Sequence, residues 1–215
     1  MTPVSRVEGR AAALPSANID TDQLIPARFM KEPRAPEGYG RFLLHDARTV
    51  GQDPLAAAPV ILVAGRNFGC GSSREAAVYA LVDFGVRCVI APSFGDIFAG
   101  NAPNNGLIAA AVPDAQAEAL MARLADGPAE FAVDLEARRI TGAGVGIAFD
   151  IDETARAKLL NGWDDIDLTA RHADAIAAFV EADATRRPWA RPGGTRPSED
   201  CATAAPVIRT MLRHP

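Results

Sequence analysis

Short apolar runs alternate with helix-like segments through the first half of the chain. The strand candidates are residues 60–64, 86–91 and 107–112, and the helix candidates are residues 73–84, 96–99 and 114–125. Strands that alternate with helices in this way predict an α/β core that contains a parallel sheet.

Two segments before this alternation carry a different pattern. Residues 6–14 predict a first strand, and residues 16–22 form a turn that is dense in short polar side chains and acids. Residues 31–59 are rich in proline, glycine and charge, with one apolar cluster at 42–44. We interpret residues 31–59 as a long loop with a functional role.

After residue 127 the pattern turns to short strands. The strand candidates 130–135 and 146–151 flank a glycine-rich turn and predict a β-rich layer beside the α/β one. Residues 153–160 and 169–182 predict two closing helices.

The last predicted helix, residues 169–182, has an apolar face. Ile176, Phe179 and Val180 have helical spacing on it, so we expect them to be buried. His172 on the same helix is expected to be structural or exposed rather than a ligand.

Arginine and proline mark the C-terminal segment. Low hydrophobicity and repeated prolines predict disorder over residues 185–215, with one short helix candidate at 206–212. Residues 1–184 are expected to form one domain.

The composition is that of an ordinary globular protein, with 215 residues, 48% hydrophobic content and a formal net charge of −5. Nucleic-acid binding is disfavoured, because the neutralisation of phosphates needs a basic face. No apolar run approaches the roughly 20 residues of a transmembrane helix, and the N-terminus lacks the pattern of a secretion signal. We therefore expect a cytoplasmic protein with neither a nucleic-acid nor a membrane partner.

The cysteines Cys70, Cys88 and Cys201 lie far apart in the sequence. They form neither a disulfide framework nor a C-x-x-C metal site. Cys88 falls in a strand candidate and is expected to be packed, whereas Cys70 has no recognisable partner for nucleophilic catalysis. A [4Fe–4S] cluster needs several converging thiolates. We therefore predict that this chain holds no metal, and that any such cluster must come from a partner.

The most informative segment joins the strand candidate 60–64 to the helix candidate 73–84. It reads Gly-Arg-Asn-Phe-Gly-Cys-Gly-Ser-Ser-Arg over residues 65–74. Its glycines allow a sharp turn and bring bare N–H groups close to a ligand, while the helix start offers its positive end to an anion. Ser72 adds a hydroxyl group and Arg74 a planar cation, which predicts a site for a small carboxylate or phosphate.

Two other interpretations of this segment compete. Ser72 and Glu75 have the S-x-x-E spacing of a capping box and could simply cap the helix. Arg74 argues for a ligand, since a cation in the first helical turn opposes the macrodipole. A dinucleotide site is disfavoured, because Arg74 stands where the third glycine of that motif belongs and the next strand candidate ends in proline and serine rather than an acid.

Several ordered motifs resemble one family. They are Asn-Ile-Asp-Thr-Asp-Gln at 18–23, Ile-Pro at 25–26, Asn-Phe-Gly-Cys-Gly-Ser-Ser-Arg-Glu at 67–75, Ile-Ala-Pro-Ser-Phe at 90–94, Asp-Ile-Phe at 96–98, Gly-Asn at 100–101, Asn-Gly-Leu at 105–107 and Leu-Thr at 168–169. Over residues 17–182 the chain is thereby similar to the small subunits of 3-isopropylmalate dehydratase, a family of the aconitase superfamily.

The resemblance implies a swivelling β/β/α domain of the aconitase C-terminal type. Such a domain docks on a separate large catalytic subunit, which carries a [4Fe–4S] cluster. The implied activity is that of a hydro-lyase on a small di-acid, which interconverts 2-isopropylmalate and 3-isopropylmalate through 2-isopropylmaleate in leucine biosynthesis. By the same resemblance, this chain binds no cofactor itself and acts only with the large subunit.

The resemblance also assigns roles to residues. Ser72 would remove the carbon-bound proton, and Asp22 would orient Ser72 or a water molecule. A serine hydroxyl is a weak base, so its alkoxide needs the helix N-terminus, the loop N–H groups and a cation. Arg74 would supply the cation and bind a substrate carboxylate in bidentate fashion. The other substrate-binding candidates are Ser73, Gly71 and Cys70.

The chain departs from the family pattern beside this site. Ala76, Val78 and Tyr79 stand where the family usually has histidine, proline and tryptophan, and Ala102 stands where serine or cysteine is common. A related hydro-lyase subunit for citraconate, methylmalate or homoaconitate therefore stays an alternative, as does a non-catalytic carboxylate-binding assembly module. We expect the loop at residues 31–53 to sense the alkyl group of the substrate.

Overall fold

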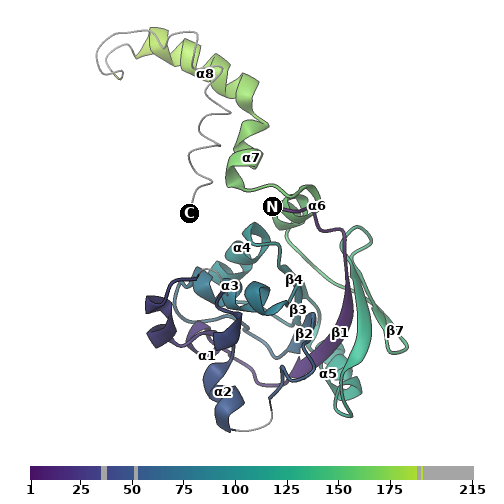
Figure 1. Ribbon diagram of the computed structural model, residues 1–215. Coiled ribbons are helices and arrows are strands. Elements are labelled where there is room, and N and C mark those ends of the chain that lie inside the picture. Colours follow the sequence, from purple (N-terminus) through teal and green to yellow (C-terminus); the bar gives the residue numbers. More distant parts are fainter. Residues whose placement is uncertain (35–37, 51–52, 188–189, 191–215) are drawn as a thin grey trace. The chain divides into compact units, whose positions relative to one another are not determined.

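The computed structural model describes residues 1–34, 38–50, 53–187 and 190. The chain divides into two compact units, Met1–Leu168 and Thr169–Pro215, and each is described by itself. The predicted boundary at residue 184 stays a prediction. The α/β class is confirmed, because the first unit is a sheet with helices on both of its faces (Figure 1).

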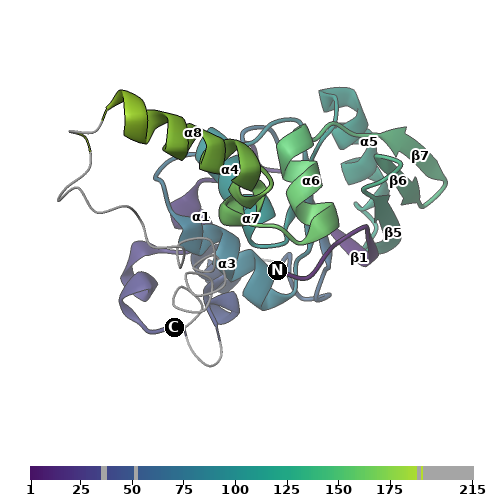
Figure 2. The same cartoon turned by 90° about the horizontal axis from the view of Figure 1, so that it is seen from above.

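A seven-stranded sheet with the order β4-β3-β2-β1-β5-β6-β7 forms the centre of the first unit. Four strands are mutually parallel: β1 (Arg6–Leu14), β2 (Ile61–Ala64), β3 (Cys88–Ala91) and β4 (Ile108–Ala111). The other three continue the sheet by antiparallel pairing: β5 (Ala129–Asp134), β6 (Arg139–Gly142) and β7 (Val145–Ala148). In Figure 2 these antiparallel strands lie at the opposite end of the first unit from α1 and α3.

The order of the strands places the helices. From β1 to β4 every step goes to the next strand in the same direction, so right-handed crossovers leave their helices on one face. The step from β4 to β5 returns across the sheet and leaves its helix on the other face. The first face carries α1 (Thr21–Leu24), α2 (His45–Val50), α3 (Glu75–Phe84) and α4 (Asp96–Asn104), and the second carries α5 (Asp114–Arg123).

Two hydrophobic clusters fill the two sides of the sheet. Along β1, Ala12 and Leu14 join the first cluster, whereas Val7 and Ala11 join the second, as the period of two of a strand requires. Every residue of β2 and β3 is buried, because helices or strands cover both of their faces. This double burial explains why these strands appear in the sequence as uninterrupted apolar runs.

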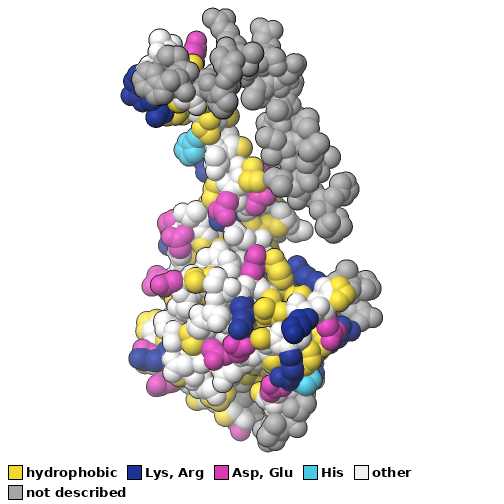
Figure 3. Space-filling model, turned by 90° about the vertical axis from the view of Figure 1, so that its left-hand side faces the viewer, with side chains coloured by type: hydrophobic (Ala, Val, Ile, Leu, Met, Phe, Trp, Pro, Cys, Tyr) yellow, Lys and Arg dark blue, Asp and Glu magenta, His cyan; other side chains and the backbone are white. Residues whose placement is uncertain are grey.

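The prediction of one long loop over residues 31–59 was wrong. The segment holds a 3-10 turn, Gly40–Phe42, and the helix α2, and it follows a 3-10 turn at Ala27–Lys31. Phe42 is buried and stacks on Phe29 with ring centroids 4.2 Å apart. Arg28 lies over the Phe29 ring and Arg41 over the Phe42 ring. On the face drawn in Figure 3, basic side chains gather beside apolar ones.

Other elements differ in extent from the prediction. The strand β6 and a short helix, α7 (Asp165–Ala170), were not predicted, and α4 continues past residue 99 to Asn104. The helix α6 (Glu153–Asn161) agrees with the predicted segment and buries Leu159.

The expected burial of the last helix was wrong. This helix, α8 (Ala173–Arg186), lies in the second unit, and Ile176, Phe179 and Val180 are all exposed. His172 is exposed and is the N-cap residue of α8. The helix reaches two residues into the predicted tail, of which residues 188–189 and 191–215 lie outside the described ones, as does the predicted helix at 206–212.

Candidate active site

The candidate site lies where β1, β2 and β3 end. Parallel neighbours have their carboxyl ends at one edge of the sheet, so the loops that follow them meet there. Main-chain hydrogen bonds join these loops: Gly69 N–H donates to the Ile19 carbonyl at 2.7 Å, and Phe68 N–H donates to the Ser93 carbonyl at 3.0 Å. Thr21 N–H donates to the Cys70 carbonyl at 2.9 Å. The glycine loop is therefore held on both sides.

Two asparagines fasten the same loops through their side chains. Asn18 and Asn67 both have left-handed backbones, with φ of 57° and 58°, a conformation that asparagine tolerates better than most residues. The Asn67 side-chain amide donates to Asn18 Oδ1 at 2.8 Å, and Asn67 N–H donates to Ser93 Oγ at 2.9 Å. Neither asparagine was among the predicted site residues, although both begin motifs that carry the family resemblance.

The glycine loop turns against a cluster of aromatic rings. Gly69 has φ of 73° and packs on Phe98. The Phe98 ring is buried, lies edge-on to Phe68 at 5.3 Å and stacks on Phe94 at 6.2 Å. Gly71 has φ of 90°, and a Cβ there would make only ordinary contacts, with Asp20 Cβ at 3.4 Å and Thr21 Oγ1 at 3.8 Å. The loop thus has a fixed base at Gly69 and an exposed tip at Gly71, Ser72 and Ser73.

The capping-box interpretation of Ser72 was wrong. The helix α3 begins at Glu75, its N-cap residue is Arg74, and no side chain caps it. Instead, Glu75 accepts a hydrogen bond from Asn105 at 3.0 Å, and the Ser72 main-chain carbonyl accepts one from the buried Thr21 hydroxyl at 3.1 Å. Within the described residues no hydrogen bond engages the Ser72 hydroxyl, so it is available to a ligand.

Arg74 and Asp22 form an ion pair across the site. The Arg74 side chain is 19% exposed and that of Asp22 is 52% exposed. Arg74 is the N-cap residue of α3 and does not lie in the first helical turn as predicted. The carboxylate of Asp22 balances its charge. A guanidinium has five N–H donors, so Arg74 can bind an anion while it keeps Asp22 as a neighbour.

A cavity of about 330 Å³ opens beside the glycine loop. It is lined by Asn67, Gly69, Cys70, Gly71, Phe94, Gly95, Asp96 and Ile97. Main-chain groups of the loop form one wall, and Phe94 with Ile97 forms an apolar one. Ile97 is 51% exposed, although it is a large apolar residue. The cavity can thus receive the apolar part of a ligand, while its polar lining consists of loop groups, Asn67 and the Asp96 carboxylate.

Comparison with known proteins settles the family. Proteins named 3-isopropylmalate dehydratase small subunit from Rubrobacter xylanophilus, Rhodospirillum centenum and Allorhizobium ampelinum are 44%, 45% and 46% identical to this chain. The alignments cover 83%, 85% and 88% of this chain and 94%, 95% and 100% of those relatives. The chain belongs to the 3-isopropylmalate dehydratase small-subunit family.

Two further likenesses agree with this family. The family model of the aconitase C-terminal domain matches residues 50–115, which include the glycine loop and the start of α3. A crystal structure of 3-isopropylmalate dehydratase from Methanocaldococcus jannaschii superposes with a TM-score of 0.60 at 24% identity, over 80% of this chain and 98% of that one. This second likeness shows the fold, and together they confirm the predicted aconitase C-terminal type of domain.

The departures from the family pattern are accommodated by packing. Val78 and Ala102 are buried in the first hydrophobic cluster, and Ala76 packs against it. Tyr79 lies under the Arg34 guanidinium, 3.9 Å from its ring centroid, and its burial together with Glu75 raises the pKa of its hydroxyl. The substitutions thus fit a well-packed α3 beneath this small-subunit site.

The described residues of this family member offer no ligand set for a cluster. They contain no group of three or more His, Cys, Asp or Glu side chains placed to hold a metal ion. Cys88 is fully buried, and burial raises the pKa of its thiol, whereas Cys70 is partly exposed in the glycine loop. In the same part of the chain, no helix combines the length and apolar character that a membrane crossing requires.

Proposed function

We propose that this chain is the small subunit of a 3-isopropylmalate dehydratase, which interconverts 2-isopropylmalate and 3-isopropylmalate through 2-isopropylmaleate in leucine biosynthesis. The observation that carries the proposal is the Ser72 hydroxyl, free of a capping role, beside the Arg74–Asp22 pair in a chain of this family. The name of the family implies a large subunit, which we propose completes the site in the cytoplasm.

Ser72 is proposed to take the carbon-bound proton of the substrate. Its hydroxyl lies on an exposed loop tip that leads into the N-terminus of α3. Main-chain N–H groups, the helix dipole and the guanidinium of Arg74 all favour the negative charge that develops on its oxygen. The same hydroxyl returns a proton at the neighbouring carbon when water adds back with the opposite regiochemistry.

Arg74 is proposed to bind a carboxylate of the substrate. Its planar group can take two oxygens at once, and the pairing with Asp22 already fixes its position before the substrate arrives. Phe94 and Ile97 line the cavity beside the glycine loop and suit the isopropyl group. Ser73, Gly71 and Cys70 belong to the same loop and are proposed to bind the substrate.

Departure of the substrate hydroxyl calls for a Lewis acid, a role that a [4Fe–4S] cluster would fill. The described residues do not provide its ligands, and we propose that the large subunit holds it. This chain then contributes proton transfer, carboxylate binding and the apolar wall.

The test is reconstitution with the cognate large subunit under anaerobic conditions. We expect the absorbance of the alkenoate to appear with 3-isopropylmalate only when both proteins are present, and each protein alone serves as control. Parallel assays with methylmalate and homoaconitate distinguish the related hydro-lyases. An assembled complex that turns over none of these substrates would leave a binding or assembly role and overturn the proposal.

A further inference from the structure

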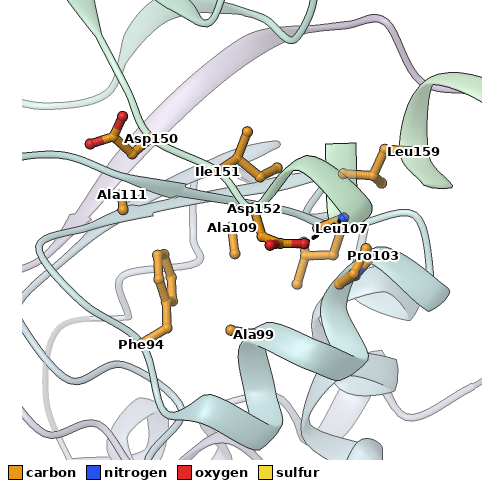
Figure 4. A pocket seen from close by; sticks show the side chains of 11 residues that line it. Phe94, Ala99, Pro103, Leu107, Ala109, Ala111, Asp150, Ile151, Asp152 and Leu159 are labelled. Carbon is orange, nitrogen blue, oxygen red and sulfur yellow. Dashed lines mark hydrogen bonds between the residues drawn. The ribbon is translucent and has the colours of Figure 1, made fainter. Parts of the chain in front are cut away.

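A second cavity, of about 390 Å³, lies at the β4 edge of the sheet (Figure 4). Its walls come from α4, β4 and the segment that leads into α6. Most of the lining is apolar: Phe94, Ala99, Pro103, Leu107, Ala109, Ala111, Ile151, Ala155 and Leu159. We call this cavity the edge groove.

The edge groove exists because the segment that pairs with the outer edge of β4 forms only one bridge to it within the described residues. Ala111 and Asp150 form an antiparallel bridge, with hydrogen bonds of 2.9 and 2.7 Å in the two directions. Two residues later, Asp152 is the N-cap of α6, so the pairing stops before it reaches Ala109. An apolar surface next to the end strand of the sheet is thereby left open.

The main-chain N–H and C=O groups of one β4 residue, Ala109, border the edge groove. Ile108 N–H donates to the carbonyl of Arg87, and Val112 N–H donates to that of Ala91, so even-numbered residues face β3. By the period of two, the N–H and C=O of Ala109 point away from β3. Such outward-pointing groups can pair with an extended segment of another chain.

The charge at the edge groove is negative. Asp152 lies at its centre, where one carboxylate oxygen accepts the Ala155 N–H at 2.9 Å (Figure 4). Asp150 is exposed at the Ala111 end. The lining contains two carboxylates and no cation, so it suits a segment that carries a basic side chain next to an apolar one.

We propose that the edge groove receives an extended segment of the large subunit, with an apolar side chain inserted and a basic one beside Asp152. This inference rests on the proposed function. Phe94 lines both the edge groove and the candidate active-site cavity, so the two adjoin at this ring, and a partner that closes the site would lie next to the groove. This shared residue is the reason for choosing the large subunit as the occupant, rather than a second copy of this chain.

The experiment measures the Kd between the purified chain and its cognate large subunit. Ala155→Trp fills the edge groove, and Ala119→Trp on the exposed side of α5 is its matched control. Asp152→Asn removes the charge but keeps the capping group of α6, and Asp126→Asn in an exposed turn is its control.

We expect Ala155→Trp to raise the Kd about tenfold or more, as the loss of an anchor pocket does. Asp152→Asn should raise it about threefold and flatten its dependence on salt. Both controls should bind like the unaltered chain, and the melting temperature of the free chain shows whether a variant is folded. If Ala155→Trp does not fold, Asp152→Asn decides by its salt dependence.

Groove variants that bind like their controls would overturn the inference, while turnover by the unaltered complex would still support the proposed function. If the groove variants bind the large subunit more weakly but the complex shows no turnover, the groove proposal is supported and the proposed function is refuted. If the unaltered chain does not bind the large subunit at all, both proposals fail.

Discussion

Gly69→Ala tests whether the base of the glycine loop is fixed by the aromatic cluster. A Cβ atom at Gly69 would clash with Cγ of Phe98 and lie 2.5 Å from its Cδ2. The Phe98 ring has no space to move away, because it is 2% exposed and lies between Phe68 and Phe94. The neighbouring Gly71 provides the control, since its nearest contact would be the Cβ of Asp20 at 3.4 Å.

The two substitutions share one cost and differ in another. Both glycines have positive φ, 73° and 90°, which costs an L-residue about 1 kcal/mol. Only Gly69→Ala also overpacks the core, which costs about 2 kcal/mol more. Melting temperature changes by about 3 °C per kcal/mol for a domain of this size, so Gly69→Ala should lower it by about 9 °C and Gly71→Ala by about 3 °C.

Thermal unfolding of the free chain, followed by circular dichroism, measures this difference. In the assembled enzyme the order should reverse, with Gly71→Ala losing more turnover per folded molecule because its methyl group enters the loop tip. Equal melting temperatures for the two variants would refute the packing argument. Unchanged turnover in Gly71→Ala would remove the loop tip from the site.

Three further predictions concern single side chains. Ser72→Ala should lower kcat by about a hundredfold or more and leave the melting temperature unchanged; a lower melting temperature with normal turnover would restore a capping role. Arg74→Lys should raise KM strongly, because a point charge cannot replace the planar fork, and steady-state kinetics with an unaltered KM would remove Arg74 from substrate binding. Burial raises the pKa of Asp83, but hydrogen bonds from Arg34 and Tyr39 N–H outweigh it and leave that pKa below its ordinary value. The ionised Asp83 therefore stabilises the fold above the ordinary carboxyl pKa, and this stabilisation is lost as pH falls through the lowered pKa. Asp83→Asn should reduce the free energy of unfolding by about 1 kcal/mol at neutral pH and by little in acid. Urea titrations that show equal losses at both pH values would contradict this.

The strands β2 and β3 and the packing of Cys88 were predicted well, because local pattern and tertiary contacts agree there. The apolar runs of β2 and β3 are buried on both faces because helices and strands cover them. The same reasoning failed for α8, where the periodicity of Ile176 and Phe179 shows an apolar face but not what covers it. Periodicity reports which residues share a face, whereas burial also depends on the rest of the chain.

Composition misled in the segment at residues 31–59. The apolar cluster at 42–44 is visible in the sequence, but the burial of Phe42 depends on its stacking on Phe29 from an earlier turn. The strand β6 was missed for a related reason. Pairing with β5 and β7 makes β6 a strand, although its short and partly exposed sequence does not predict one.

The sequence by itself determined the chemistry of the candidate site, because glycines, serines and arginine follow one another over residues 65–74. It did not determine which of them act on a ligand and which on the protein. The tertiary structure decided this: Thr21 holds the Ser72 carbonyl outside α3, and Asp22 meets Arg74 from 52 residues away. These contacts form because β1 and β2 are parallel neighbours whose carboxyl ends bring two distant loops to one edge, which no local pattern encodes.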